Sequence, residues 1–177
     1  MDHQGVALPK SSFNSPIPCL LKMGNIPAMK TLLLTALLLA ASPALLSAKT
    51  LVNVDRHGIG INGYDPVAYF TDAKAVKGNP AISSSADGVI YYFTTPEHKA
   101  SFDANPAKYE PQFGGFCAYG LSRNSLVEID PMAFQIVNGR LLLQYSKGVM
   151  AKFNKDQASF LQRADSNWAV LVEKKGK

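Results

Sequence analysis

Beyond residue 48, three side chains carry the donor atoms that soft metal ions prefer: the thiol of Cys117 and the imidazoles of His57 and His98. Met132 and Met150 add two thioethers. One cysteine and two histidines cannot complete a tetrahedral zinc site unless carboxylates join them, whereas thiolate, imidazole and thioether together suit copper. The set therefore predicts a site for a metal ion such as copper on Cys117 and His98, with His57 as a further ligand.

Cys117 also fits a purely structural role. It is the one cysteine after residue 48, so it cannot form a disulfide within that part of the chain. Cysteine is among the residue types most often buried, and the adjacent Gly114, Gly115 and Ala118 suit a tightly packed turn. A Cys117–His98 nucleophile and base is a third alternative. It comes without an orienting third residue, and the chain has no phosphate loop or dinucleotide fingerprint, so we expect binding rather than turnover.

A second kind of site would use aromatic residues with polar tips. Such residues either belong to the core or line a small apolar pocket, which is the usual form of a ligand site. The candidates for ligand binding are Tyr64, Asp65, Tyr92 and Tyr119. The alternative to a metal site is therefore a non-metal module that binds a small ligand or a protein through an aromatic cleft.

The clearest local structure is a strand followed by a short helix. Residues 89–93 are β-branched and aromatic and follow an Asp-Gly pair, which predicts a strand. Thr94 and Glu97 have the spacing of a capping box, and Pro96 suits the first helical turn. The helix should end at Asn105-Pro106, because the residue before proline avoids the α conformation.

Downstream, the sequence predicts a hairpin and a long amphipathic helix. Asn138-Gly139 separates two apolar runs, 133–137 and 140–145, and is the preferred dipeptide of a type I′ turn. Residues 155–172 carry an apolar stripe at spacings of three and four, which predicts a helix with one face on the sheet. The stripe consists of Phe160, Leu161, Ala164, Trp168 and Leu171.

The remaining segments are shorter. We expect short strands at 58–63, 82–85 and 126–127, and a helical turn at 148–153. Residues 67–70 are apolar on both faces and fit either a helical turn or a buried strand. Together the elements predict a small single α+β domain of short antiparallel strands, with a short central helix and a C-terminal amphipathic helix.

Three blocks follow one another along the sequence: Gly63–Phe70, Tyr91–Tyr109 and Gly114–Tyr119. Together they resemble the YHS domain family, in its branch of small exported bacterial proteins, and the resemblance extends from about Val54 to the C-terminus. It implies a binding domain, since relatives with this domain are associated with the handling of heavy metals, especially copper. Metal-linked relatives carry two cysteines at the strand-to-helix step, where this chain has Thr94 and His98. Within the third block, Tyr119 is, like His57, a candidate for a further ligand beside Cys117 and His98.

The first 48 residues predict export. Met29-Lys30 precedes an eleven-residue apolar run, 31–41, and the segment ends at the small residue Ala48. These are the parts of a secretory signal peptide over 29–48, and the run is shorter than the ~20 residues of a membrane span. An uncleaved anchor is the alternative. Residues 1–28 fit no element and are interpreted as an extended or mis-assigned start. After cleavage of the signal peptide, the mature domain would be 49–177. We expect it to be periplasmic or secreted and to have no stable membrane span.

Charge argues against one class of partner. The chain has a formal net charge of +5, and loss of 1–48, with three lysines and one aspartate, lowers it to +3. The basic residues are spread out apart from Lys174, Lys175 and Lys177. Nucleic-acid binding needs a denser basic surface, so we expect a metal ion, a small ligand or an unidentified protein as the partner.

Overall fold

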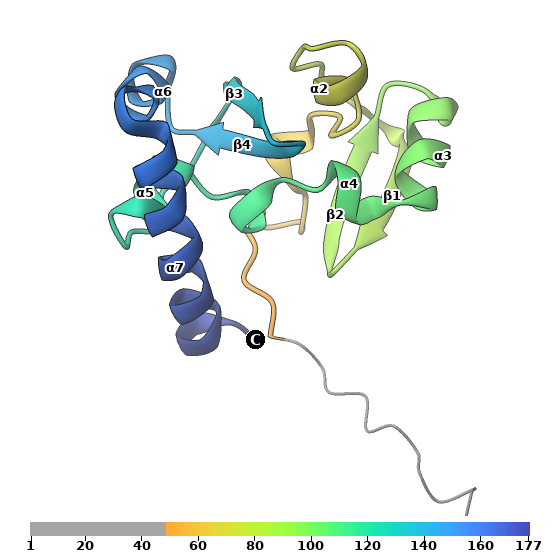
Figure 1. Cartoon of the computed structure of the whole chain (residues 1–177). Coiled ribbons are helices and arrows are strands. Elements are labelled where there is room, and N and C mark those ends of the chain that lie inside the picture. The colour runs from red at the N-terminus through yellow and green to blue at the C-terminus, as the bar shows by residue number, and fades with distance from the viewer. Residues whose placement is uncertain (1–48) are drawn as a thin grey trace, which may run out of the picture. The chain divides into compact units, whose positions relative to one another are not determined.

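The computed structural model describes residues 49–177, which form an α+β domain of two two-stranded antiparallel sheets, short helices and a long C-terminal helix (Figure 1). The predicted fold class is thereby confirmed. The predicted extension 1–28 and the predicted signal peptide 29–48 lie outside the described residues. Within residues 49–177, no helix is both long and apolar enough to cross a bilayer.

The first sheet is a hairpin of β1 (Asn79–Ala86) and β2 (Val89–Phe93). Its turn residues Asp87 and Gly88 both have positive φ angles, 48° and 79°, as a type I′ turn requires. Val89, Tyr91 and Phe93 point into the core, since alternate residues of a strand face the same side. The strand predicted at 89–93 is confirmed, and the one at 82–85 lies within β1.

Helix α3 (Pro96–Ala104) follows β2, and α4 (Pro106–Tyr109) follows after Asn105, where the sequence predicts a break. The predicted cap is wrong by one residue. Thr95, not Thr94, caps α3, since its side chain accepts a hydrogen bond from the backbone N–H of His98 at 3.2 Å. Thr94 and Thr95 could each cap the helix, but Thr94 is hydrogen-bonded through its hydroxyl and its backbone N–H to the buried carboxylate of Asp65.

Two segments predicted as strands, 58–63 and 126–127, do not form them. The stretch 58–63 forms isolated bridges from Ile59 and Gly60, followed by the 3-10 helix η1 (Ile61–Gly63). Residues 67–70 resolve as a helix, α2 (Ala68–Thr71). The strand predicted at 126–127 is wrong, because these residues lie in a loop.

The second sheet is the hairpin of β3 (Asp130–Val137) and β4 (Arg140–Gln144). Its turn residues Asn138 and Gly139 have φ angles of 52° and 75°, which confirms the type I′ hairpin predicted from the Asn-Gly pair.

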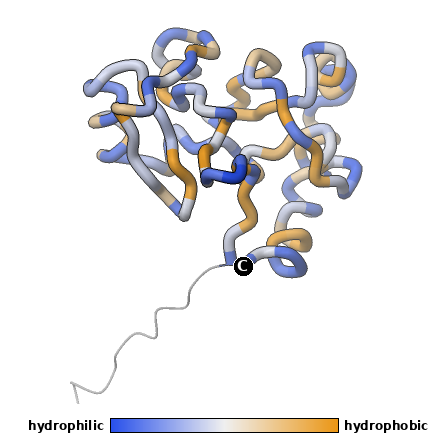
Figure 2. The backbone as a smooth tube through the Cα atoms, turned by 180° about the vertical axis from the view of Figure 1, so that it is seen from behind, coloured by the Kyte–Doolittle hydropathy of each residue, from blue (hydrophilic) through white to orange (hydrophobic). Residues whose placement is uncertain are grey.

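The C-terminal part is helical and packs on η2 (Gln112–Gly115) and α5 (Ala118–Ser122). It consists of α6 (Lys147–Phe153), η3 (Asn154–Asp156) and α7 (Gln157–Lys175). The tube of α7 alternates between hydrophobic and hydrophilic residues (Figure 2). Its predicted stripe does face the core, but the main surface beneath it is α5 rather than a sheet.

Two hydrophobic clusters meet at β4. Leu141 and Leu143 belong to the cluster around β2, α2 and α3, whereas Leu142 belongs to the cluster under α7. All three leucines are 0% exposed. Because adjacent strand residues point to opposite faces, β4 is buried on both sides and joins the two clusters.

Candidate functional site

Asp65 is the most densely hydrogen-bonded side chain among the predicted site residues. It is fully buried in the turn before α2. Its Oδ1 accepts from the backbone N–H groups of Val67 at 2.8 Å and Ala68 at 3.3 Å. Its Oδ2 accepts from the Thr94 backbone N–H at 2.8 Å, the Thr94 hydroxyl at 2.7 Å and His98 Nδ1 at 2.7 Å. The carboxylate therefore fastens the start of α2 to the junction of β2 and α3.

His98 lies between this carboxylate and a hydroxyl. His98 Nδ1 donates to the Asp65 carboxylate, and the other ring nitrogen, Nε2, lies 3.3 Å from Thr71 Oγ1. The order hydroxyl, imidazole, carboxylate is that of a catalytic triad. The Thr71 hydroxyl, however, donates to the Val67 carbonyl at 3.2 Å, so its hydrogen is already used inside α2. His98 therefore serves as a link between elements.

Cys117 is 1% exposed and is held in place by three hydrogen bonds. Its sulfur accepts from the backbone N–H groups of Gly120 at 3.4 Å and Tyr145 at 3.3 Å. Its thiol donates to Gln144 Oε1 at 3.4 Å, and the same oxygen accepts from the Tyr119 N–H at 3.0 Å. These contacts support the structural alternative, in which the thiol caps the short helix α5 from within the core.

The predicted copper ligands share no contact in the structure. Cys117 lies against α5 and the end of β4, whereas His98 contacts Asp65, Thr94 and Thr71. His57 lies in an exposed turn, where its Nε2 accepts from Arg56 Nε at 3.0 Å. Over residues 49–177, no three His, Cys, Asp or Glu side chains gather as a metal site would need.

Of the four residues predicted to line an aromatic cleft, Tyr64 and Tyr92 lie close together beside Gly63 and Lys77, whereas Tyr119 belongs to the other hydrophobic cluster. Tyr64 lies under the ammonium of Lys77, 5.0 Å from its ring centroid, and Tyr119 packs edge-on against Phe160 at 5.1 Å. Asp65 is buried in its own network, and Tyr92 packs beside Gly63. None of the four lines the pocket that α7 forms with the β1–β2 hairpin.

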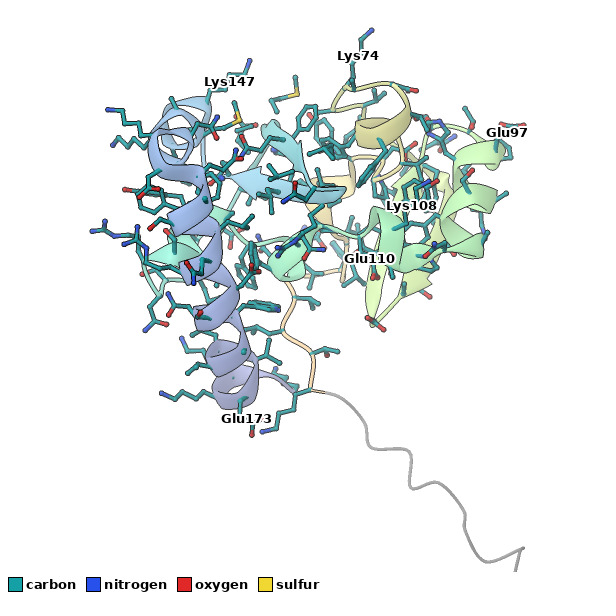
Figure 3. All side chains as sticks on the ribbon, viewed as in Figure 1. Lys74, Glu97, Lys108, Glu110, Lys147 and Glu173 are labelled. Atoms are coloured by element: carbon teal, nitrogen blue, oxygen red, sulfur yellow. The ribbon has the colours of Figure 1, made fainter. Side chains whose placement is uncertain are left out.

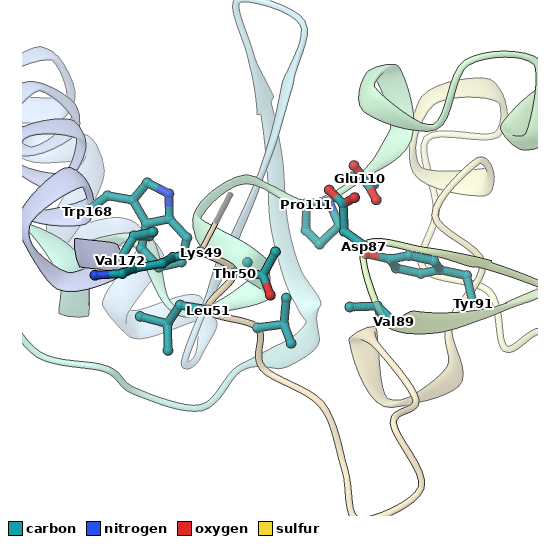
Figure 4. Close-up of a pocket in the computed structure, with 12 residues that line it drawn as sticks. Lys49, Thr50, Leu51, Asp87, Val89, Tyr91, Glu110, Pro111, Trp168 and Val172 are labelled. Carbon is teal, nitrogen blue, oxygen red and sulfur yellow. The ribbon is translucent and has the colours of Figure 1, made fainter. Parts of the chain in front are cut away.

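That pocket, about 230 Å³ in volume, opens between α7 and the β1–β2 hairpin (Figure 4). Residues from four separate parts of the chain line it. They are Lys49, Thr50, Leu51, Val52, Asp87, Val89, Tyr91, Glu110, Pro111, Gly114, Trp168 and Val172. Trp168 and Val172 form one wall, Asp87, Glu110 and Tyr91 lie on the other, and Thr50 and Leu51 run between them.

The chain approaches itself closely at the floor of the pocket. Gly114 has a φ angle of +57°, and a Cβ atom there would lie 2.0 Å from the Leu51 carbonyl oxygen. The Asn53 N–H donates to the Gly114 carbonyl at 2.8 Å, and this hydrogen bond holds the segment around Leu51 and Asn53 beside η2. Only glycine allows both this backbone angle and this contact.

The charged wall of the pocket is acidic. Burial raises the pKa of Glu110 above its usual value, and the nearby charge of Asp87 raises it further. Burial, followed by the charges of Glu110 and Asp87, also raises the pKa of Tyr91. Among the described residues, Lys49 is the one cation lining the pocket, and it is paired with Glu173 Oε1 at 2.6 Å at the rim.

Sequence reasoning missed this pocket because each residue that lines it also fits an ordinary structural role. The strand pattern places Tyr91 in the core, the apolar stripe places Trp168 on a packed helix face, and Asp87 belongs to a turn. A usable signal is Gly114-Gly115, which predicts a close backbone approach without naming the segment that approaches. Comparisons of the chain with models of known families, with curated proteins and with solved structures found no match.

Proposed function

We propose that this protein binds a small organic molecule in the pocket between α7 and the β1–β2 hairpin. The observation that carries the proposal is the lining, which combines apolar and aromatic walls with two carboxylates in a cavity of about 230 Å³. Ligand sites are typically concave, mostly apolar and equipped with a few polar groups that fix orientation.

The pocket replaces the aromatic cleft as the location of a non-metal site. The sulfur of Cys117 is already engaged by two backbone N–H groups and an amide oxygen, so a metal ion would have to displace that packing. The pocket needs no such rearrangement. Its ligand would meet Trp168, Tyr91 and Val89 as they stand.

Export is part of the proposal. The predicted signal peptide, 29–48, and the resemblance to exported YHS-domain proteins support a periplasmic or secreted binding protein. The chain at Lys49 and Thr50 forms one edge of the pocket, so the ligand would bind beside the point at which the predicted leader ends.

The test is a fragment screen read by the fluorescence of Trp168, the single tryptophan of the chain, with amide NMR shifts to locate each hit. Hits should shift Leu51, Val89 and Trp168. Val172→Phe should fill the pocket and abolish binding, whereas Val170→Phe is the matched control, because Val170 is 49% exposed on the same helix. Hits that map to Cys117 or His98, or that survive Val172→Phe, would contradict the proposal.

A further inference from the structure

We propose that the ligand is an organic monocation: an ammonium group on a compact apolar or aromatic body. The inference rests on the proposed function and narrows it to a chemical class. Its basis is the division of the pocket into an acidic wall, with Asp87 and Glu110, and an apolar wall, with Trp168 and Val172.

The acidic wall has no cation of its own. Within residues 49–177, neither Asp87 nor Glu110 forms an ion pair, and Lys49 is committed to Glu173 through both its carboxylate and its backbone carbonyl at 2.9 Å. Glu110 follows directly after α4 and is half-buried, so water solvates its carboxylate less well than that of an exposed residue. An ammonium group placed between the two carboxylates would supply the missing counter-charge.

The opposite wall favours an organic cation over a metal ion. Ca²⁺ takes six to eight oxygen ligands and Mg²⁺ keeps a shell of water, whereas this pocket offers two carboxylates beside apolar and aromatic side chains. Trp168 on this wall and Tyr91 beside the carboxylates are aromatic, and an aromatic ring can attract an ammonium group because its face carries negative potential. Leu51, Val89 and Val172 would cover the ligand's apolar body.

The charge pattern also runs against the charge of the whole chain. With a net charge of +5, the protein as a whole should attract anions, yet the lining places two acids where a ligand would sit. A preference for cations would therefore come from this pocket and not from a general surface effect.

The experiment compares three probes of similar shape: 2-phenylethylamine, 2-phenylethanol and phenylacetate. Binding to the full chain is followed by Trp168 fluorescence and by calorimetry. We expect the amine to bind at least about fivefold more tightly than the alcohol, and the carboxylate to bind most weakly. Glu110→Gln and Asp87→Asn should each reduce that preference, and the double variant should abolish it. Asn tolerates the positive φ angle of residue 87, so the turn is kept.

Glu97→Gln is the matched control, because Glu97 is an exposed carboxylate on α3, well apart from Glu110 (Figure 3). It should leave the preference unchanged. If the alcohol binds as tightly as the amine or more tightly, and Val172→Phe abolishes this binding, the inference is overturned but the proposed function stands. Tight binding of Ca²⁺ or Mg²⁺ that excludes the amine would overturn the inference as well. If none of the probes binds and the fragment screen finds nothing in the pocket, both proposals are refuted.

Discussion

Replacing Asp65 by asparagine should remove a large part of the stability of this domain. The change keeps the shape of the side chain but takes away its charge. It also places an NH₂ group either opposite the donors of Thr94 and His98 or opposite the N–H groups of Val67 and Ala68. Whichever way the amide turns, donors face donors in a fully buried site.

The magnitude follows from those contacts. Removing one partner of a buried charged pair costs about 3–5 kcal/mol, and each buried donor left without an acceptor costs about 1–3 kcal/mol. We therefore expect Asp65→Asn to lower the free energy of unfolding by about 4 kcal/mol, a substantial share of the 5–15 kcal/mol typical of a domain.

The assay is urea denaturation at pH 7, with Asp165→Asn as the matched control. Asp165 pairs with Arg140 at 2.5 Å, but its side chain is 46% exposed, so its loss should cost about 1 kcal/mol or less. If Asp65→Asn loses no more stability than Asp165→Asn, the buried network does not hold α2 to the β2–α3 junction, and the reasoning fails.

Three further predictions test the pocket floor, its acidic wall and the buried thiol. Gly114→Ala should lower the free energy of unfolding by about 3 kcal/mol in the same assay, because the new methyl group meets the Leu51 carbonyl at a positive φ angle; an unchanged value would contradict the close approach. The pKa of Glu110 is raised in the folded state, so folding binds its proton more tightly. Relative to Glu110→Gln, the wild type should therefore gain stability as pH falls from 7 through that raised pKa towards 4.5, and a constant difference across this range would refute the effect. Cys117 should react with a thiol reagent only on unfolding, and fast labelling of Cys117 in the folded protein would contradict its burial. Copper(I) titration of the reduced protein should show no site that both Cys117→Ala and His98→Ala weaken, and such a shared site would restore the metal hypothesis.

Local signals allow much of the fold to be predicted. The Asn138-Gly139 hairpin, the strand 89–93 and the stripe of α7 each depend on residues close together in the sequence, and all three are confirmed. The misplaced cap of α3 shows where such signals stop. Thr94 and Thr95 are equivalent from sequence, and the choice is made by Asp65, which lies 29 residues upstream of Thr94.

The candidate site is less predictable for the same reason. Cys117, His98 and His57 are grouped because their side chains are potential metal ligands, but no local sequence pattern shows whether such side chains lie close together in the fold. The pocket depends on Leu51 passing Gly114 and on α7 folding back beside them. These contacts join segments more than fifty residues apart, and no periodicity or turn motif encodes them.

The double-sided burial of β4 bears on how the domain comes apart. Leu141 and Leu143 are packed in one cluster and Leu142 in the other, so neither cluster can open without exposing the same strand. The two clusters should therefore lose their structure in a single cooperative transition rather than one after the other. In native-state hydrogen exchange, the hydrogen-bonded amides of β4 should exchange by global unfolding alone, whichever cluster a destabilising substitution weakens.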